Sequence, residues 1–239
     1  GVCGCGGYWG LGGGVCGGLA LTAACIALFT SETAPRTAAA IDETTPRTRL
    51  LHPAAVLPGT ILLRGMFGLA GFASFTALYA REIGMSDSRG VLALYAVVIL
   101  AVRILGAKVP DRIGPVRSAS IATTTGAIGL VVIAAIPHPA GLVAGTVVLA
   151  VGMSMLYPSM LMLALADHPA NERGSAVGTV SSFFDLSQGA GAAILGVIAS
   201  FSGYRGAFVG AAAFALAALA LLRWDVARRS RRTVASVTA

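Results

Sequence analysis

One acidic residue, Asp185, occupies a position where a carboxyl group could do chemistry that water-exposed carboxylates do not. It lies about ten residues into an apolar run from about residue 175 to 200, which corresponds to ~15 Å of helix and to the middle of a bilayer. A carboxylate is costly there and is by default a functional hypothesis. It could exchange a proton or bind a substrate in a cavity, or it could form a structural hydrogen bond to a neighbouring helix. The sequence leaves both uses open.

Two polar side chains share the helix face of Asp185, because Gln188 follows it by three residues and Ser181 precedes it by four. Gln188 is therefore a second candidate for a substrate or proton path. Tyr157, next to Pro158 in another apolar run, is a third. We expect Pro158 to be able to break its helix where the backbone lines a cavity.

Two arginines also lie inside apolar runs. Arg103 is about one turn from the end of its run, so its long side chain can reach the membrane interface. Arg64 lies about seven residues, or ~10 Å, into its run, and could face a translocation path and bind an anionic group. Either guanidinium could pair with Asp185, and the sequence does not decide between them.

Composition requires that these side chains be positioned by membrane helices. Charged residues make up 11% of the 239-residue chain, against about 25% in a soluble domain. Apolar residues make up 56% and the mean hydropathy is +0.82. A soluble fold could not hide this much apolar surface, so the sequence predicts an all-α integral membrane protein. The net charge of +7 is concentrated in loops and in the tail, so it indicates topology and no nucleic-acid partner.

Seven apolar runs are long enough to be read as membrane spans. A polar connector over 30–56 separates the first run from the rest, and a basic tail over 224–239 follows the last. The predicted spans are 8–29, 57–80, 91–107, 119–136, 141–165, 175–200 and 204–222.

The loops between these spans differ in their basic residues. One set of alternate loops and the tail holds twelve: Arg36, Arg47, Arg49, Lys108, Arg112, Arg117, Arg173, Arg223, Arg228, Arg229, Arg231 and Arg232. The opposite set holds three: Arg81, Arg89 and Arg205. Basic loops favour the cytoplasm. We therefore expect the connector and the C-terminus to be cytoplasmic and the N-terminus to be outside.

The densest polar interruption is the loop from Gly106 to Arg117. Gly106 is expected to close the preceding helix, and Gly114 with the following proline to make a turn before the next one. Between them stands the adjacent pair Asp111-Arg112. The pattern is a glycine, four residues, Asp-Arg, one residue, a glycine and then a basic residue.

This pattern resembles the loop signature of the major facilitator superfamily (MFS) of secondary transporters, which recurs once in each half of those proteins. The stretches 152–159 and 172–208 are similar to helices of its bacterial efflux permeases. The resemblance implies a six-helix MFS half-bundle over 57–223 plus one preceding transmembrane helix, residues 1–29 being the last helix of an N-terminal half that is otherwise missing.

The resemblance also implies a mechanism and partners. The resemblance implies that such a transporter moves a small-molecule substrate by alternating access in the cell inner membrane, coupled to an ion or proton and working as an efflux antiporter or symporter. Gly106, Asp111, Arg112, Gly114 and Arg117 would form a cytoplasmic gating loop, with Asp111 facing a helix N-terminus of the missing half. The partners implied are the lipid bilayer, the substrate and that half. The alternative is a truncated membrane protein without transport of its own, acting as an interaction partner or a relic.

Enzymatic readings find little support in the sequence. His52, His138 and His168 lie at or outside the ends of the spans, so no membrane-embedded nucleophile–histidine pair is expected. Cys3, Cys5, Cys16 and Cys25 lack a metal-site spacing, and there is no phosphate-cradling loop. We expect no enzymatic activity, no cofactor and no metal site.

Overall fold

The computed structural model describes residues 18, 21, 22, 25, 53–106, 109–166 and 172–237. The chain divides into two compact units, Gly1–Thr48 and Arg49–Ala239, and the fold described below is that of the second. Most of the predicted first span and nearly all of the connector lie outside the described residues, so the count of seven spans remains a prediction.

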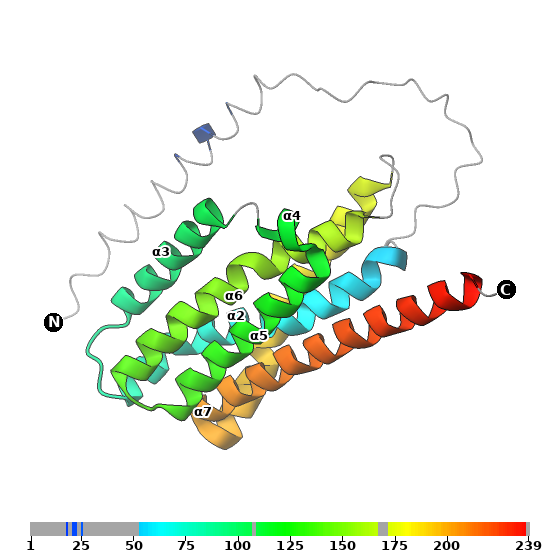
Figure 1. Ribbon diagram of the computed structural model, residues 1–239. Coiled ribbons are helices and arrows are strands. Elements are labelled where there is room, and N and C mark those ends of the chain that lie inside the picture. The colour runs from blue at the N-terminus through cyan, green and yellow to red at the C-terminus, as the bar shows by residue number, and fades with distance from the viewer. Residues whose placement is uncertain are drawn as a thin grey trace. The chain divides into compact units, whose positions relative to one another are not determined.

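The described part of the second unit is entirely helical apart from short turns, as the composition predicts (Figure 1). Its helices are α2 (Pro53–Glu82), α3 (Arg89–Leu105), α4 (Val109–Ile113), α5 (Pro115–Ala135), α6 (Pro139–Leu165) and α7 (Arg173–Val237). Of these, α2, α5, α6 and α7 are long and apolar enough to cross a membrane. Helix α3 has 17 residues, or about 26 Å at the usual helical rise.

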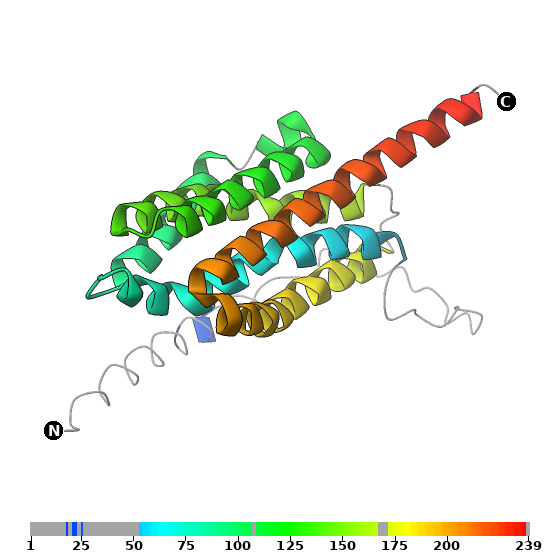
Figure 2. The same ribbon diagram turned by 90° about the horizontal axis from the view of Figure 1, so that it is seen from below.

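Helix α7 consists of two arms that meet at Gly203. That glycine has φ 70° and ψ 179°, a conformation that an L-residue with a side chain rarely adopts. The chain turns back there, so the two arms form a hairpin (Figures 1 and 2). Each of the six spans predicted after residue 57 therefore coincides with a helix or a helix arm.

The helix boundaries follow local sequence signals. Gly106 forms the C-cap of α3, and Gly114, with φ 83°, precedes α5, whose first residue is Pro115. His138 caps α6, because its Nδ1 accepts a hydrogen bond from the Ala140 backbone at 3.2 Å.

Three local outcomes were not expected. The loop before α5 forms the short helix α4, and α7 continues through the basic tail as far as Val237. The expected break at Pro158 is wrong, because α6 runs through Pro158 without interruption. Within a membrane protein, neighbouring groups can compensate for the hydrogen bond that a proline removes.

Helices α5 and α6 pack with their backbones in contact. A Cβ atom added to Gly129 would lie 2.5 Å from the backbone nitrogen of Leu149, and one added to Gly145 would lie 2.8 Å from the carbonyl oxygen of Gly129. A Cβ atom on Gly152 would lie 2.5 Å from the backbone nitrogen of Gly126. Small residues of this kind let membrane helices approach closely, and here they leave no room for any side chain.

Two long-range hydrogen bonds hold the end of α5 in place. The hydroxyl of Tyr79 in α2 donates to the carbonyl oxygen of Ile133 at 3.0 Å, and Nε of Arg205 in α7 donates to that of Ala134 at 2.8 Å. The Tyr79 ring also packs edge-on against Phe208, with 5.4 Å between ring centroids. These contacts tie α2, α5 and α7 together.

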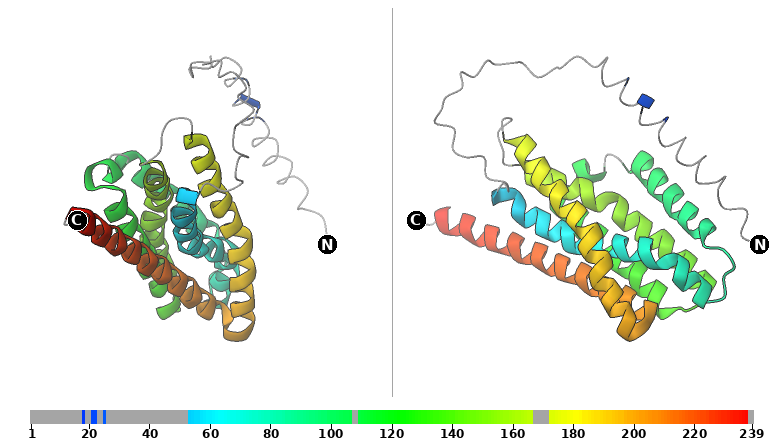
Figure 3. Two further views of the ribbon diagram at one scale, coloured as in Figure 1. Left: turned by 90° about the vertical axis from the view of Figure 1, so that its right-hand side faces the viewer. Right: turned by 180° about the vertical axis from the view of Figure 1, so that it is seen from behind.

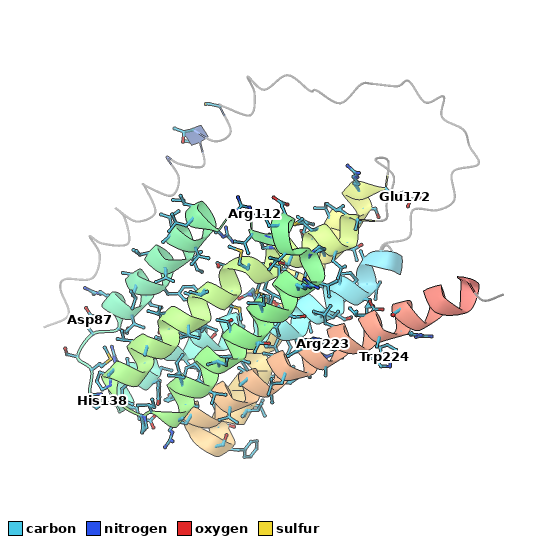
Figure 4. The ribbon with its side chains drawn as sticks, in the orientation of Figure 1. Asp87, Arg112, His138, Glu172, Arg223 and Trp224 are labelled. Carbon is cyan, nitrogen blue, oxygen red and sulfur yellow. The ribbon has the colours of Figure 1, made fainter. Side chains whose placement is uncertain are left out.

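Successive spans run in opposite directions, and α2 packs against α5, α6 and α7 (Figure 3). Asp87 and His138 lie at one end of the bundle, and Arg112 and Glu172 lie toward the other (Figure 4). Three further arginines lie at the first end, because each is close to a helix end or turn located there: Arg81, Arg89 and Arg205. The second end carries the more basic set of described residues: Arg112, Arg117, Arg173, Arg223 and Arg228.

Candidate substrate cavity

A cavity of about 350 Å³ lies among α2, α3, α6 and α7. Three of the residues predicted from the sequence line it, Arg103, Tyr157 and Asp185, each from a different helix. The full lining is Met66, Leu69, Tyr95, Ile99, Arg103, Met153, Tyr157, Ser181, Phe184 and Asp185. A mostly apolar wall with a few convergent polar groups is the usual character of a small-molecule site.

Helical spacing explains how α3 presents its side chains to this cavity. Tyr95, Ile99 and Arg103 follow one another at intervals of four residues, and side chains at that spacing lie on one face of a helix. All three line the cavity. One face of α3 thus supplies a tyrosine, an isoleucine and an arginine to the wall of the same cavity.

Tyr157 connects two walls of the cavity. Its hydroxyl lies 3.1 Å from that of Ser181, so a hydrogen bond joins α6 to the first arm of α7. Its ring meets Phe184 edge-on, with the centroids 5.4 Å apart. This geometry fixes the position of Tyr157 and places two hydroxyl groups side by side on the cavity wall.

Asp185 lies one residue from Phe184 on the same wall and is exposed. Among the residues described, no hydrogen bond and no ion pair within 4.0 Å involves its carboxylate. The pairing with Arg64 or Arg103 that the sequence allowed is therefore not formed within this part of the chain. A carboxylate that lines a cavity without a protein partner can bind a proton or a cationic group of a ligand.

Sequence reasoning missed Tyr95. Its hydroxyl is buried and has no hydrogen-bond partner among the described residues, whereas its ring packs against Phe72 with 4.8 Å between centroids. Buried hydroxyls are rarely left unpaired, and this one belongs to a side chain of the cavity wall. The available signal was its position eight residues before Arg103, on the same helix face.

Two other predicted candidates do not line this cavity. The Arg64 guanidinium folds back along α2, and its Nη1 lies 3.5 Å from the carbonyl oxygen of Thr60. The Gln188 side chain contacts its neighbour, with Nε2 3.4 Å from the hydroxyl oxygen of Ser187. Both are half-buried, and their roles remain predictions.

A second cavity, of about 320 Å³, shares Arg103 and Tyr157 with the first. Pro110, Ser154 and Pro158 also line it. Because proline has no N–H group, the carbonyl oxygen of Ser154 loses its usual donor four residues further along α6. The shared residues place the second cavity next to the first, and Pro110 of α4 lies in its wall.

The predicted gating residues lie at that end. Asp111 and Arg112 are exposed in α4, and Arg117 is exposed in the first turn of α5. Gly114 supplies the positive φ that separates the two helices, as described above. Gly106 has no room for a side chain, because a Cβ atom there would lie 2.6 Å from the carbonyl oxygen of Val102. The five residues thus lie between the end of α3 and the first turn of α5, and their gating role stays a prediction.

Comparison with known proteins identifies related sequences. A family model described as Major Facilitator Superfamily matches residues 91–238. The chain is 32% identical over 179 residues to an uncharacterized MFS-type transporter of Salmonella typhimurium, covering 74% of this chain and 46% of the relative. An uncharacterized MFS-type transporter of Pseudomonas aeruginosa is 32% identical over 174 residues, covering 73% of this chain and 43% of the relative.

A third relative is more distant. The uncharacterized MFS-type transporter YhhS of Escherichia coli is 27% identical over 183 residues, covering 74% of this chain and 45% of that protein. The chain therefore spans about half the length of the curated relatives it matches.

Proposed function

Because the chain belongs to the major facilitator superfamily of membrane transporters, we propose that it forms one six-helix half of a secondary active transporter. It moves a small molecule across the cell membrane by alternating access, in which two halves rock around a shared site. The three relatives described above are named as transporters, which supports a transporter rather than an enzyme.

The observation that carries this proposal is the cavity that brings Arg103, Tyr157 and Asp185 together. Asp185 lies twelve positions after Arg173, the first residue of α7, which is ~18 Å along the helix. A site at that depth is near the midplane of a bilayer. Substrate and ion sites of secondary transporters lie at this level.

Asp185 is the proposed proton carrier of the cycle. Its carboxylate lines the cavity without an ion pair in the described part of the chain, so a proton or a substrate cation can neutralise it. Alternating access exposes the same group first to one side of the membrane and then to the other. The resemblance to efflux permeases favours export, with a proton entering as the substrate leaves.

A second six-helix half is the proposed partner. Rocking needs two bodies, and the chain spans about half the length of its relatives. Asp111 and Arg112, which are exposed at one end of the bundle, are available to contact that half and to close the cytoplasmic side. The chain alone, as a monomer in reconstituted vesicles, is therefore expected to support no transport.

The test substitutes Asp185 within the complete transporter, in inside-out membrane vesicles. A pH-sensitive dye reports the proton gradient, and proton-coupled turnover dissipates that gradient when a substrate is added. Asp185→Asn should abolish the dissipation and leave exchange of labelled substrate measurable, because the amide keeps the shape but cannot titrate. Asp185→Glu should retain part of the activity.

Asp87→Asn provides the control, because Asp87 is an exposed carboxylate outside the spans, with 58% of its side chain accessible. It should leave proton-coupled turnover unchanged. If Asp185→Asn dissipates the gradient as well as the parent protein does, Asp185 is not the proton carrier. If no added compound dissipates the gradient in the parent protein either, proton coupling itself is contradicted.

A further inference from the structure

An exposed stripe runs along the second arm of α7 and ends in a tryptophan and an arginine. Leu216, Ala220, Trp224 and Arg228 are spaced four residues apart and all are exposed, so they lie on one helix face. Leu216 is 52% and Trp224 is 55% accessible. An apolar stripe that ends in tryptophan and then arginine matches the order of acyl chain, interface and headgroup region in a bilayer.

The tryptophan and the arginine are in direct contact. Cζ of Arg228 lies 5.2 Å from the centroid of the Trp224 ring, within the range of a cation–π interaction. Stacking on the indole face orients the guanidinium while its N–H groups remain available in the guanidinium plane. A planar arginine can give two parallel hydrogen bonds to phosphate oxygens.

The depth of these groups fits the headgroup layer. The polar regions add roughly 5–7 Å to each side of the hydrocarbon core. If Trp224 marks the boundary, Arg228 lies about 6 Å further along the helix axis, inside that layer. Arg223 directly precedes Trp224 and is also exposed.

The exposed charged residues described in this part of α7, Arg223 and Arg228, are both positive. The one acidic residue of the chain after Arg223 is Asp225, and it is buried, with 9% of its surface accessible. It therefore faces away from the exposed stripe. The sequence adds Arg229, Arg231 and Arg232 within the next turn, so positive charge continues beyond the stacked pair.

We propose that Arg223, Trp224 and Arg228 form a binding site for the headgroups of anionic phospholipids. Net negative headgroups complement a site with two exposed arginines, whereas the choline of a zwitterionic lipid offsets its phosphate. This goes beyond transport of a substrate and depends only on the second arm of α7 crossing the membrane. It gives the C-terminal helix a preferred lipid at the membrane interface.

The two tryptophans of the chain, Trp9 and Trp224, permit a direct test. In a Trp9→Phe background, fluorescence reports on Trp224 alone. The purified chain is placed in bilayers of phosphatidylcholine and phosphatidylglycerol, in which one lipid at a time carries brominated acyl chains that quench a neighbouring indole. At equal mole fractions, brominated phosphatidylglycerol should quench Trp224 more strongly than brominated phosphatidylcholine, and added salt should reduce the difference.

Substitutions of the two arginines test whether they cause the preference for phosphatidylglycerol. Arg223→Gln and Arg228→Gln should each lower the relative affinity for phosphatidylglycerol by about five-fold. Arg228→Lys should keep more of the preference than Arg228→Gln, because it retains the charge and loses only the planar geometry. Arg89→Gln is the control, because Arg89 is an exposed arginine at the opposite end of the bundle, with 92% of its side chain accessible.

Equal quenching by the two brominated lipids would overturn the proposal. A preference for phosphatidylglycerol that survives Arg223→Gln and Arg228→Gln would overturn it equally, since the selectivity would then come from elsewhere in the chain. Neither result depends on transport, so the lipid site and the proposed function can fail separately.

Discussion

Arg205 Nε donates a hydrogen bond to the carbonyl oxygen of Ala134 across 2.8 Å, so that the second arm of α7 holds the last turn of α5. The two residues are 71 positions apart in the chain. A cation at the C-terminal end of a helix also interacts favourably with the helix dipole. This bond therefore joins two spans by a charge-assisted contact.

Arg205→Met should destabilise the bundle, because it removes this donor and keeps much of the side-chain volume. Hydrogen bonds from charged groups contribute about 1.5–3 kcal/mol. Thermal unfolding of the purified chain in detergent measures the effect. Arg89→Met at the same end of the bundle is the control, since its contact to Asp87 is exposed and 3.9 Å long. If both variants unfold at the parental temperature, the Arg205 bond contributes nothing to stability.

Replacement of Gly129 or Gly145 by alanine should separate α5 from α6. The added Cβ atom would meet backbone atoms of the opposite helix at 2.5 to 2.8 Å, and backbone cannot move aside as a flexible side chain can. Overpacking of this kind costs about 1–3 kcal/mol. The measurement is again the unfolding temperature.

The matched control for the glycine variants is Gly189→Ala. Apart from the adjacent backbone of its own helix, no atom lies within 4 Å of the position that its Cβ would occupy, and alanine favours a helix over glycine by up to ~1 kcal/mol. This variant should be neutral or stabilising. Parental stability in Gly129→Ala would contradict the close backbone packing of α5 and α6.

Tyr95→Phe and Tyr79→Phe should have different effects on stability. Both remove one hydroxyl, but that of Tyr79 donates to Ile133 and that of Tyr95 has no partner in the described residues. Loss of the Tyr79 bond should cost about 1 kcal/mol, whereas loss of an unpaired buried hydroxyl should be neutral or stabilising. Equal destabilisation in thermal unfolding would show that Tyr95 has a structural partner, and would weaken its assignment to the cavity.

The predicted orientation can be read from two exposed positions, Ser86 after α2 and Ala166 after α6. Single cysteines are introduced at each in a cysteine-free background. An impermeant thiol reagent should label Ser86→Cys in intact cells and Ala166→Cys only after permeabilisation, because basic loops favour the cytoplasm. The reverse pattern would invert the topology.

The helices could be predicted from the sequence because apolar length is a property of each segment by itself. The candidate site could be predicted only in part. Asp185 and Arg103 are recognisable as charged residues inside apolar runs, and Tyr157 by its place beside Pro158. Their convergence on one cavity depends on how four helices rotate and pack. Tyr95 was missed because a tyrosine in an apolar run is ordinary until its hydroxyl is seen to be unpaired.

Pairing between side chains was the least predictable property. The sequence allowed Asp185 to pair with Arg64 or Arg103, whereas the Arg64 guanidinium lies against the Thr60 carbonyl oxygen of its own helix. Depth along a helix fixes how far a charge lies from water, but it does not fix the direction in which a long side chain points.

The uninterrupted course of α6 through Pro158 has a consequence for substitutions at Ser154, which lines the second cavity. The acceptor at residue 154 is a main-chain carbonyl oxygen, set free by the missing N–H of Pro158. Substitution of Ser154 itself would alter the hydroxyl and leave that oxygen in place. The loss of this helical hydrogen bond is thus determined by residue 158, and no substitution at residue 154 would restore it.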